Sequence, residues 1–253
     1  MALRVYFLLA ALLTSFPASA QMTVNDVPEP SAAAKEALSK MLKLAGADLA
    51  LPALRGMGTI AAEGKTERVS VYGKPGYYRL ERPDSQTVIV TKGSRGMLFT
   101  GAKRQALQGT APSTIQAWMF PIFTDLRRWA DPGTSVSSLA GSTSTNTSQG
   151  IQVTLPADRG SEAQSSNALK LSVWISNQTS LPTKIRVHRS SRETDATGLD
   201  VDLILSDYRN VGGFFVPFRC EERANRKTLY TIQLEAVSVD SSTPSSLPTQ
   251  DLN

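Results

Sequence analysis

The stretch that decides the fold is Ser206–Arg219, SDYRNVGGFFVPFR, which lies between two runs with strand character. The preceding run is Thr197–Leu205, and from Leu199 onward its apolar residues alternate with aspartates, as they do in a half-buried strand. Asn210–Gly213 supplies the turn, because glycine accepts a positive φ without steric cost. The next strand then opens with Phe214, Phe215, Val216 and Phe218 and continues through Cys220–Val239. The sequence therefore predicts a β-hairpin with one apolar face.

More strands of the same kind are predicted on both sides of this hairpin. Between Arg55 and Gln108, turn residues recur at short intervals and separate short β-prone pieces, which is typical of an antiparallel meander. Within it, Tyr78 and Leu80 share one face, and Tyr77 and Arg79 share the other. A second meander is predicted from about residue 134 onward, through Val136, Leu139, Ile151–Leu155, Leu169–Ile175, Leu181–Arg189 and Leu229–Val239.

Two segments have helical periodicity instead. Ser31 is placed to cap a helix from Ala32 to about Ala45, whose apolar residues recur at three- and four-residue steps. A second stripe runs from Ile115 to Trp129 and is interrupted by Pro121, which predicts two short helices joined at that point. This aromatic segment has two interpretations, an ordinary core helix or a broken helical lid over an apolar cavity.

The order of elements is therefore helix, meander, broken helices, meander. We expect an α+β fold in which an antiparallel sheet carries helices on one face. Residues 1–20 are predicted to be a cleavable signal peptide, since Arg4 precedes a short apolar run, Val5–Leu13, and Ala18-Ser19-Ala20 forms an A-x-A cleavage site. That run is shorter than the roughly 20 residues of a membrane span. We interpret 21–31 as a tether, 32–240 as one domain and 241–253 as a disordered tail.

Composition argues against several function classes. The chain has 253 residues and a formal net charge of +5, a mild basic excess that does not indicate nucleic acid as a partner. With one histidine, His188, and one cysteine, Cys220, no internal disulfide can form and no histidine cluster can hold a metal. We interpret Cys220 as a small packed residue. No catalytic, cofactor-binding or metal-binding residue is nominated, and the chain is predicted not to be an enzyme.

One charged row has two interpretations. Lys184, Arg186 and His188 alternate with Thr183, Ile185 and Val187, so the three basic residues share one face of a predicted strand. They form either a solvated sheet face or a contact surface for an anionic membrane or partner.

The order of elements resembles the LolA/LolB-like lipoprotein-sorting superfamily, as do Leu181-Pro182-Thr183-Lys184-Ile185, Ser206–Gly213 and Val216-Pro217-Phe218. The resemblance implies a curved, incomplete antiparallel sheet, a half-open β-barrel. It also implies that the N-terminal helix and the central broken helices cover an apolar cavity that holds acyl chains. LolA-like members are soluble carriers between two membranes of the cell envelope, so the resemblance implies a periplasmic location.

From this resemblance we expect a monomer that carries an acylated lipid or a lipoprotein as cargo. The process expected is the sorting of lipoproteins to the outer membrane, and envelope membrane proteins are expected as further partners. The alternative is an envelope sensor module that binds a protein partner and carries no cargo. No cofactor is expected. The candidate lipid-binding residues are Trp118, Met119, Ile122, Phe123 and Leu126 in the lid, with Leu80 and Phe99 lining the cavity.

Overall fold

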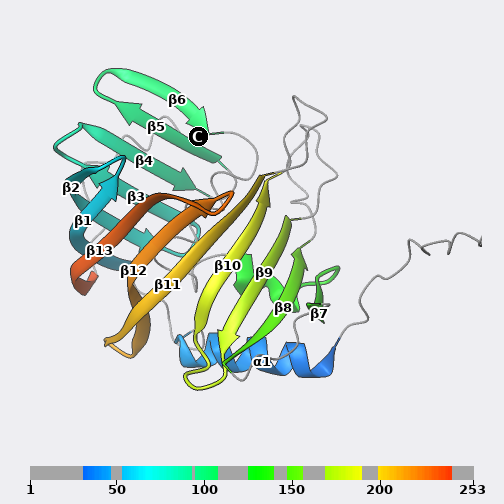
Figure 1. The fold of residues 1–253 in the computed structure, drawn as a ribbon. Coiled ribbons are helices and arrows are strands. Elements are labelled where there is room, and N and C mark those ends of the chain that lie inside the picture. Colours follow the sequence, from blue (N-terminus) through cyan, green and yellow to red (C-terminus); the bar gives the residue numbers. More distant parts are fainter. Residues whose placement is uncertain are drawn as a thin grey trace, which may run out of the picture.

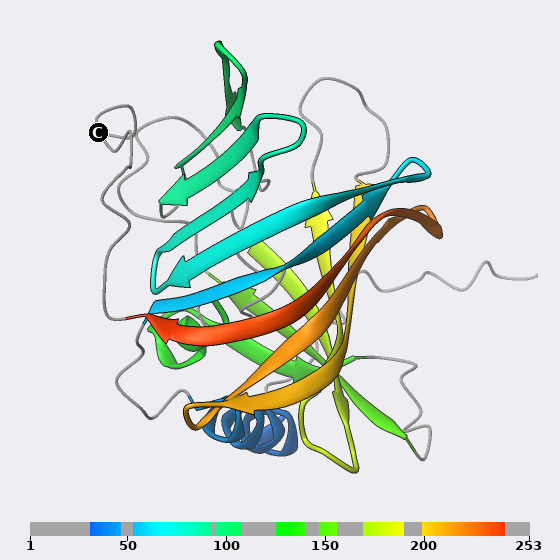
Figure 2. The ribbon, with the colours of Figure 1, turned by 90° about the vertical axis from the view of Figure 1, so that its left-hand side faces the viewer.

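The protein is seen here in a computed structural model that describes residues 31–46, 53–92, 95–107, 125–139, 147–155, 169–189 and 199–240. Their strands form one 13-stranded sheet in the order β6-β5-β4-β3-β2-β1-β13-β12-β11-β10-β9-β8-β7. All neighbouring strands are antiparallel. The sheet is strongly curved and does not close, because β6 and β7 form its two edges (Figure 1, Figure 2).

The sheet divides into two meanders that we call wings. The first wing contains β1 Ala53–Ala62, β2 Lys65–Lys74, β3 Tyr77–Arg82, β4 Thr87–Lys92, β5 Arg95–Thr100 and β6 Lys103–Leu107. The second wing contains β7 Ser135–Ser138, β8 Ser148–Leu155, β9 Leu169–Ser176, β10 Pro182–Arg189, β11 Leu199–Val211, β12 Phe214–Ala224 and β13 Lys227–Asp240. Both meanders were predicted, and both are confirmed.

The wings join where β1 pairs with β13, and this joint contains an irregularity. The register shifts between Met57 and Gly58, which marks a bulge. A Cβ atom at Gly58 would lie 2.0 Å from the backbone oxygen of Gln233, and one at Gly56 would lie 2.8 Å from Val71 Cγ2. A bulge increases local twist and bend, and a glycine allows the neighbouring backbone to approach closely. These features let the sheet bend where the two wings meet.

The hairpin at Ser206–Arg219 has the predicted form. Val211 pairs with Phe214, so the loop consists of Gly212 and Gly213 alone. Both glycines have positive φ, of 61° and 94°, and the Asn210 side-chain oxygen accepts a hydrogen bond from the Gly213 backbone N–H at 3.1 Å. Two-residue loops with both φ values positive match the twist of the flanking strands. This loop therefore sets the register between β11 and β12.

Helix α1, Ala32–Leu44, lies across one end of the second wing (Figure 1). As predicted, Ser31 caps it: its Oγ accepts a hydrogen bond from the Ala34 backbone N–H at 3.2 Å. The helix is attached at both ends. The Ser31 backbone N–H donates to the Val136 carbonyl of β7 at 3.2 Å. At the other end, Gly46 lies so close to Phe214 of β12 that a Cβ there would be 2.5 Å from the ring.

The alternating pattern separates the sheet into two faces. Inner-face residues of both wings, the apolar stripe of α1 and Leu126 form one large buried cluster. A smaller cluster of Tyr72, Tyr77 and Val90 lies on the outer face of the first wing. The predicted division of β3 is confirmed, because Tyr78 and Leu80 belong to the large cluster and Tyr77 to the small one.

The predicted central helices are described only in part. Residues 125–130 form a short 3-10 helix, Asp125–Ala130, which we call η2. The break predicted at Pro121, and most of the predicted helical stripe, fall outside the described residues.

Candidate functional site

The inner face of the sheet is the candidate site, because apolar side chains from both wings meet there. Strand β3 of the first wing contributes Tyr78 and Leu80. The second wing contributes alternate residues of each strand, among them Val153, Leu171, Val173, Ile175, Ile185, Val187, Leu203, Leu205, Val216 and Cys220. All of these are at most 4% exposed. The inner face is thus a continuous apolar surface whose side chains are covered.

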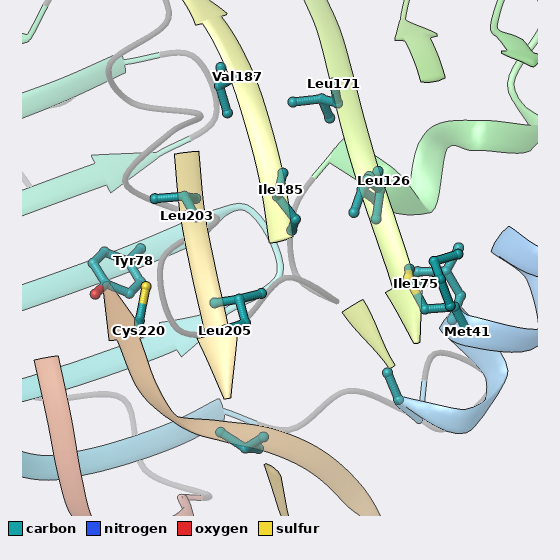
Figure 3. Packing of buried hydrophobic residues seen from close by; sticks show 14 of the residues in the cluster. Met41, Tyr78, Leu126, Leu171, Ile175, Ile185, Val187, Leu203, Leu205 and Cys220 are labelled. Carbon is teal, nitrogen blue, oxygen red and sulfur yellow. The ribbon is translucent and has the colours of Figure 1, made fainter. Parts of the chain in front are cut away.

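The two wings touch at Tyr78 and Cys220, which lie side by side (Figure 3). Tyr78 is 2% exposed and Cys220 is fully buried. Burial raises the pKa of the Tyr78 hydroxyl well above its usual value, and the nearby Cys220 adds to this rise. Burial likewise raises the pKa of the Cys220 thiol, with further contributions from Glu222 and Glu221. Cys220 is therefore a packed thiol held in its neutral form, which confirms the interpretation from sequence.

Two short helical elements cover the inner face of the second wing. Met41 of α1 points toward Ile175 of β9, and Leu126 of η2 points onto the same strand (Figure 3). Leu126 is fully buried in this contact. An element packed on a sheet mainly through apolar side chains can separate from it without breaking backbone pairing. Movement of η2 would uncover part of the inner face, whereas movement of α1 would also break the backbone hydrogen bond from Ser31 to Val136 of β7.

A polar pair, Glu222 and Tyr230, lies within the apolar inner face. Glu222 follows Cys220 on the inner face of β12 and is 3% exposed. The Tyr230 hydroxyl of β13 donates a hydrogen bond to Glu222 Oε2. Burial raises the pKa of Tyr230 well above its usual value, and the charge of Glu222 and the hydrogen bond to it raise it further. The pair supplies fixed polar groups within an apolar surface, an arrangement that orients ligands in many binding sites.

The predicted site residues have different outcomes. Leu80 of the sheet and Leu126 of the central helical segment both belong to the inner cluster. Phe99 pairs with Val88 and packs with the outer cluster, so it lies on the face opposite to Leu80. Trp118, Met119, Ile122 and Phe123 fall outside the described residues.

Sequence reasoning missed Glu222 and Tyr230 as members of this face. The signal was present, since Phe214, Val216, Phe218, Cys220 and Glu222 fall on alternate positions of a single strand. A strand whose inner residues are apolar and then include one carboxylate predicts a buried acid with a nearby hydroxyl or cationic partner.

The basic row predicted on β10 does lie on the outer face, but its charges are compensated. Arg186 makes two hydrogen bonds to Asp202 of β11, at 2.6 and 2.9 Å. The ammonium of Lys184 lies 3.4 Å from the centre of the Trp174 ring. The side chain of His188 falls outside the described part. Of the two interpretations, the solvated sheet face agrees better with this arrangement.

The described residues hold no group of three His, Cys, Asp or Glu side chains that could bind a metal ion. Among the helices of the described part, none has the length and apolar character that a membrane span requires.

Comparison with known proteins finds similarity at the level of fold. No family model matches the chain, and no curated protein matches it. A LolA superfamily protein from Nitrosomonas europaea superposes with a TM-score of 0.53 and 15% identity, over 87% of this chain and 99% of that one. A DUF1329 family protein from Desulfovibrio piger gives 0.52 and 12%, over 84% and 95% of the two chains. A domain assigned to outer membrane lipoprotein sorting from Vibrio parahaemolyticus gives 0.52 and 11%, over 85% and 97%.

These identities are low, and the likeness concerns architecture. The predicted resemblance to the LolA/LolB-like superfamily is confirmed for the fold: a curved, unclosed antiparallel sheet with a helix at one end.

Proposed function

We propose that the chain is an exported periplasmic binding protein that takes up an acylated, lipophilic cargo on the inner face between its two wings. The observation that carries the proposal is the continuous apolar inner face, to which both wings, α1 and η2 contribute. A LolA-like fold supports the same interpretation, because one of the similar structures is a domain assigned to lipoprotein sorting. On this proposal, lipoprotein sorting to the outer membrane is one process that the protein serves.

The energy scale of acyl binding suits such a carrier. Burial of one methylene stabilises by about 0.8 kcal/mol, so a chain of about sixteen carbons gains about 12 kcal/mol before costs. The main cost here is specific: inner-face residues such as Leu80, Leu126 and Leu203 are already fully buried in the inner cluster. The cargo must replace these contacts, so uptake requires the wings to separate or α1 and η2 to move outward.

The remaining parts of the proposal follow from the sequence. Residues 1–20 direct export and are removed, and the mature domain works as a monomer that meets envelope membrane proteins at loading and release. Trp118, Met119, Ile122 and Phe123 form the lid together with Leu126. No catalytic residue and no cofactor is required, because the cargo is bound and released unchanged.

Native mass spectrometry of residues 21–253, purified without detergent, tests the proposal. We expect a mass excess that disappears on denaturation and extracts as acylated lipid or acylated peptide. The double variant W118D/F123D should lose this excess while its far-UV circular dichroism stays that of the wild type. An unmodified mass that persists after incubation with acylated peptides and lipids would contradict the proposal and direct attention to a protein partner.

A further inference from the structure

The outer face of the first wing combines apolar and basic side chains in register. Tyr72, Arg79, Val90 and Met97 lie side by side across β2 to β5. The next row holds Lys74, Tyr77, Lys92 and Arg95. Both rows mix apolar and basic side chains, and each row crosses four neighbouring strands, β2 to β5.

The centre of this face is apolar. Tyr72, Tyr77 and Val90 form the outer cluster, and Val88, Met97 and Phe99 pack against it while remaining half-buried. Met57 of β1 points to the same face and is 55% exposed, the largest value among the exposed large hydrophobic residues of the described part. The inner face of the first wing forms part of the core, and its outer face is therefore a second apolar surface.

Positive charge surrounds this apolar centre. Arg55, Lys74 and Lys92 make no ion pair within the described part of the chain, and Arg95 and Arg104 lie on the same face. Among the residues that the register of β1 to β6 directs to this face, the single carboxylate is Glu81, which accepts a hydrogen bond from Arg79 Nε. The face is therefore electropositive.

Two hydrogen-bond donors at the centre lack an acceptor within the described part of the chain. They are the hydroxyl of Tyr77 and Nη1 of Arg79, and both are buried. Tyr77 is 7% exposed and Arg79 is 9% exposed. Burial raises the pKa of the Tyr77 hydroxyl, while the charge of Arg79 and a hydrogen bond from Arg79 to the Tyr77 oxygen work against this rise, which places the two groups close together. Buried donors without an acceptor are costly, and an anionic oxygen is the partner that would satisfy both.

We propose that the outer face of the first wing docks on a bilayer of anionic phospholipids, with a lipid phosphate accepting hydrogen bonds from Tyr77 and Arg79. Arg55, Lys74 and Lys92 then face the headgroups, while the apolar centre contacts the upper acyl region. Aromatic and long basic side chains together are typical of this interface, since each has an apolar body and a polar tip. The surface lies on the opposite side of the sheet from the cargo face, so a docked protein keeps that face available.

The test is flotation of residues 21–253 with vesicles of phosphatidylcholine alone and of phosphatidylcholine with about 30% phosphatidylglycerol. We expect binding to the anionic vesicles only, with loss of binding between about 0.05 M and about 0.5 M NaCl because salt screens the attraction. Binding to neutral vesicles at the same level, or binding that does not respond to salt, would overturn the proposal.

Variants locate the surface. The double variant K74E/K92E should bind anionic vesicles at least about twentyfold more weakly, since each basic residue near such a surface contributes roughly fivefold. The matched control K40E/K170E changes the same charge at exposed residues of α1 and of β9 and should bind like the wild type. Equal loss in the two double variants would mean that net charge alone drives association, and would refute a docking face.

The phosphate contact is tested with Y77F and R79M. Y77F removes a hydroxyl whose hydrogen has no acceptor in the described part of the chain, so its unfolding midpoint should stay near the wild-type value. R79M also removes the hydrogen bond that Arg79 Nε donates to Glu81, so its midpoint should fall. We expect the affinity of each variant for anionic vesicles to fall about tenfold or more. Unchanged affinity in both variants would overturn the assigned contact. Acyl cargo uptake, measured on the same variants by native mass spectrometry, should be unaffected, so failure of the docking proposal and failure of the cargo proposal give different results.

Discussion

The two wings of the sheet share one core but differ on their outer faces. On the second wing, opposite charges lie beside each other on neighbouring residues: Arg186 with Asp202, and Arg223 with Glu221. On the first wing, the outer face has an apolar centre and several basic residues, of which Arg79 and Arg68 pair with carboxylates in the described part, Glu81 and Asp84. A compensated, polar face is what solvent exposure favours, whereas an apolar, electropositive face is typical of a surface that meets another phase or partner. The comparison assigns solvation to one wing and contact to the other.

The contact between the wings can be followed with the thiol of Cys220, where we expect the largest effect. The thiol is fully buried beside Tyr78, and its pKa is raised by burial. Alkylation requires an exposed thiolate, so labelling of the native protein should be at least about a thousandfold slower than labelling in denaturant. The measurement is the rate of reaction with a maleimide reagent, followed by mass. Rapid labelling of a folded protein would mean that the wings are not closed on each other at this point.

Truncation of inner-face residues should be much more costly than truncation on the outer face. L80A and L203A each remove a fully buried side chain, one from each wing, and we expect a loss of about 2–5 kcal/mol in the free energy of unfolding. F99A removes a half-buried outer residue and should cost clearly less. Urea unfolding followed by tryptophan fluorescence gives the three values. A similar cost for F99A and L80A would contradict the division of the two faces.

The buried polar pair should contribute an intermediate amount. Y230F removes the hydroxyl that donates to Glu222 and leaves this buried carboxylate with less hydrogen bonding. We expect a loss of about 1–3 kcal/mol in the free energy of unfolding. T231V, one residue along on the outer face of β13, is the control and should change stability by less than about 0.5 kcal/mol. If Y230F and T231V unfold at the same urea concentration, the pair does not stabilise the fold.

The paired charges of the second wing should have the smallest effect, and it should depend on pH. Burial tends to raise the pKa of Asp202, but hydrogen bonds from Arg186 and the charges of Arg186, Lys184 and Arg223 outweigh this and lower it. A carboxyl whose pKa is lower in the folded state stabilises the protein above its unfolded pKa of about 4, and this contribution is lost as pH falls through the folded pKa.

R186Q should therefore cost about 1 kcal/mol near neutral pH, since both partners are partly exposed to solvent, and the cost should decrease toward acidic pH. Thermal or urea unfolding at pH 7 and near pH 3 measures this difference, with K170Q as the matched control on the same wing. A cost that is the same at both pH values would show that packing of the Arg186 side chain, rather than its ion pair, stabilises the protein.

Much of the local structure could be predicted from sequence, but the way the wings meet could not. The Gly212-Gly213 hairpin and the split of Tyr78 from Tyr77 follow from alternation and turn chemistry, which are local properties. The prediction that Phe99 lines the cavity is wrong, and alternation could not have corrected it, because Met97, Leu98 and Phe99 are all apolar. Only pairing with Val88 places Phe99 outside.

The contact between Tyr78 and Cys220 depends on the curvature of the whole sheet. That curvature is affected by the bulge at Met57 and Gly58, where β1 pairs with a strand far along the sequence. The fit of such a bulge depends on Gln233 and Leu234 in the partner strand, and no local pattern contains this information. For the same reason Glu222 and Tyr230 meet on the inner face without any motif that joins them.

The measurement that tests the central claim most directly is photo-crosslinking of a palmitoyl probe with a diazirine at the end of its chain. The probe is bound to residues 21–253, and the adducts are mapped by peptide mass spectrometry. The account predicts adducts on peptides that carry the inner-face residues Leu80, Leu126 and Leu203, with the acyl chain between the wings. Adducts confined to the outer-face segment Val88–Phe99, or spread evenly over the surface, would contradict the assignment of the inner face as the cargo site.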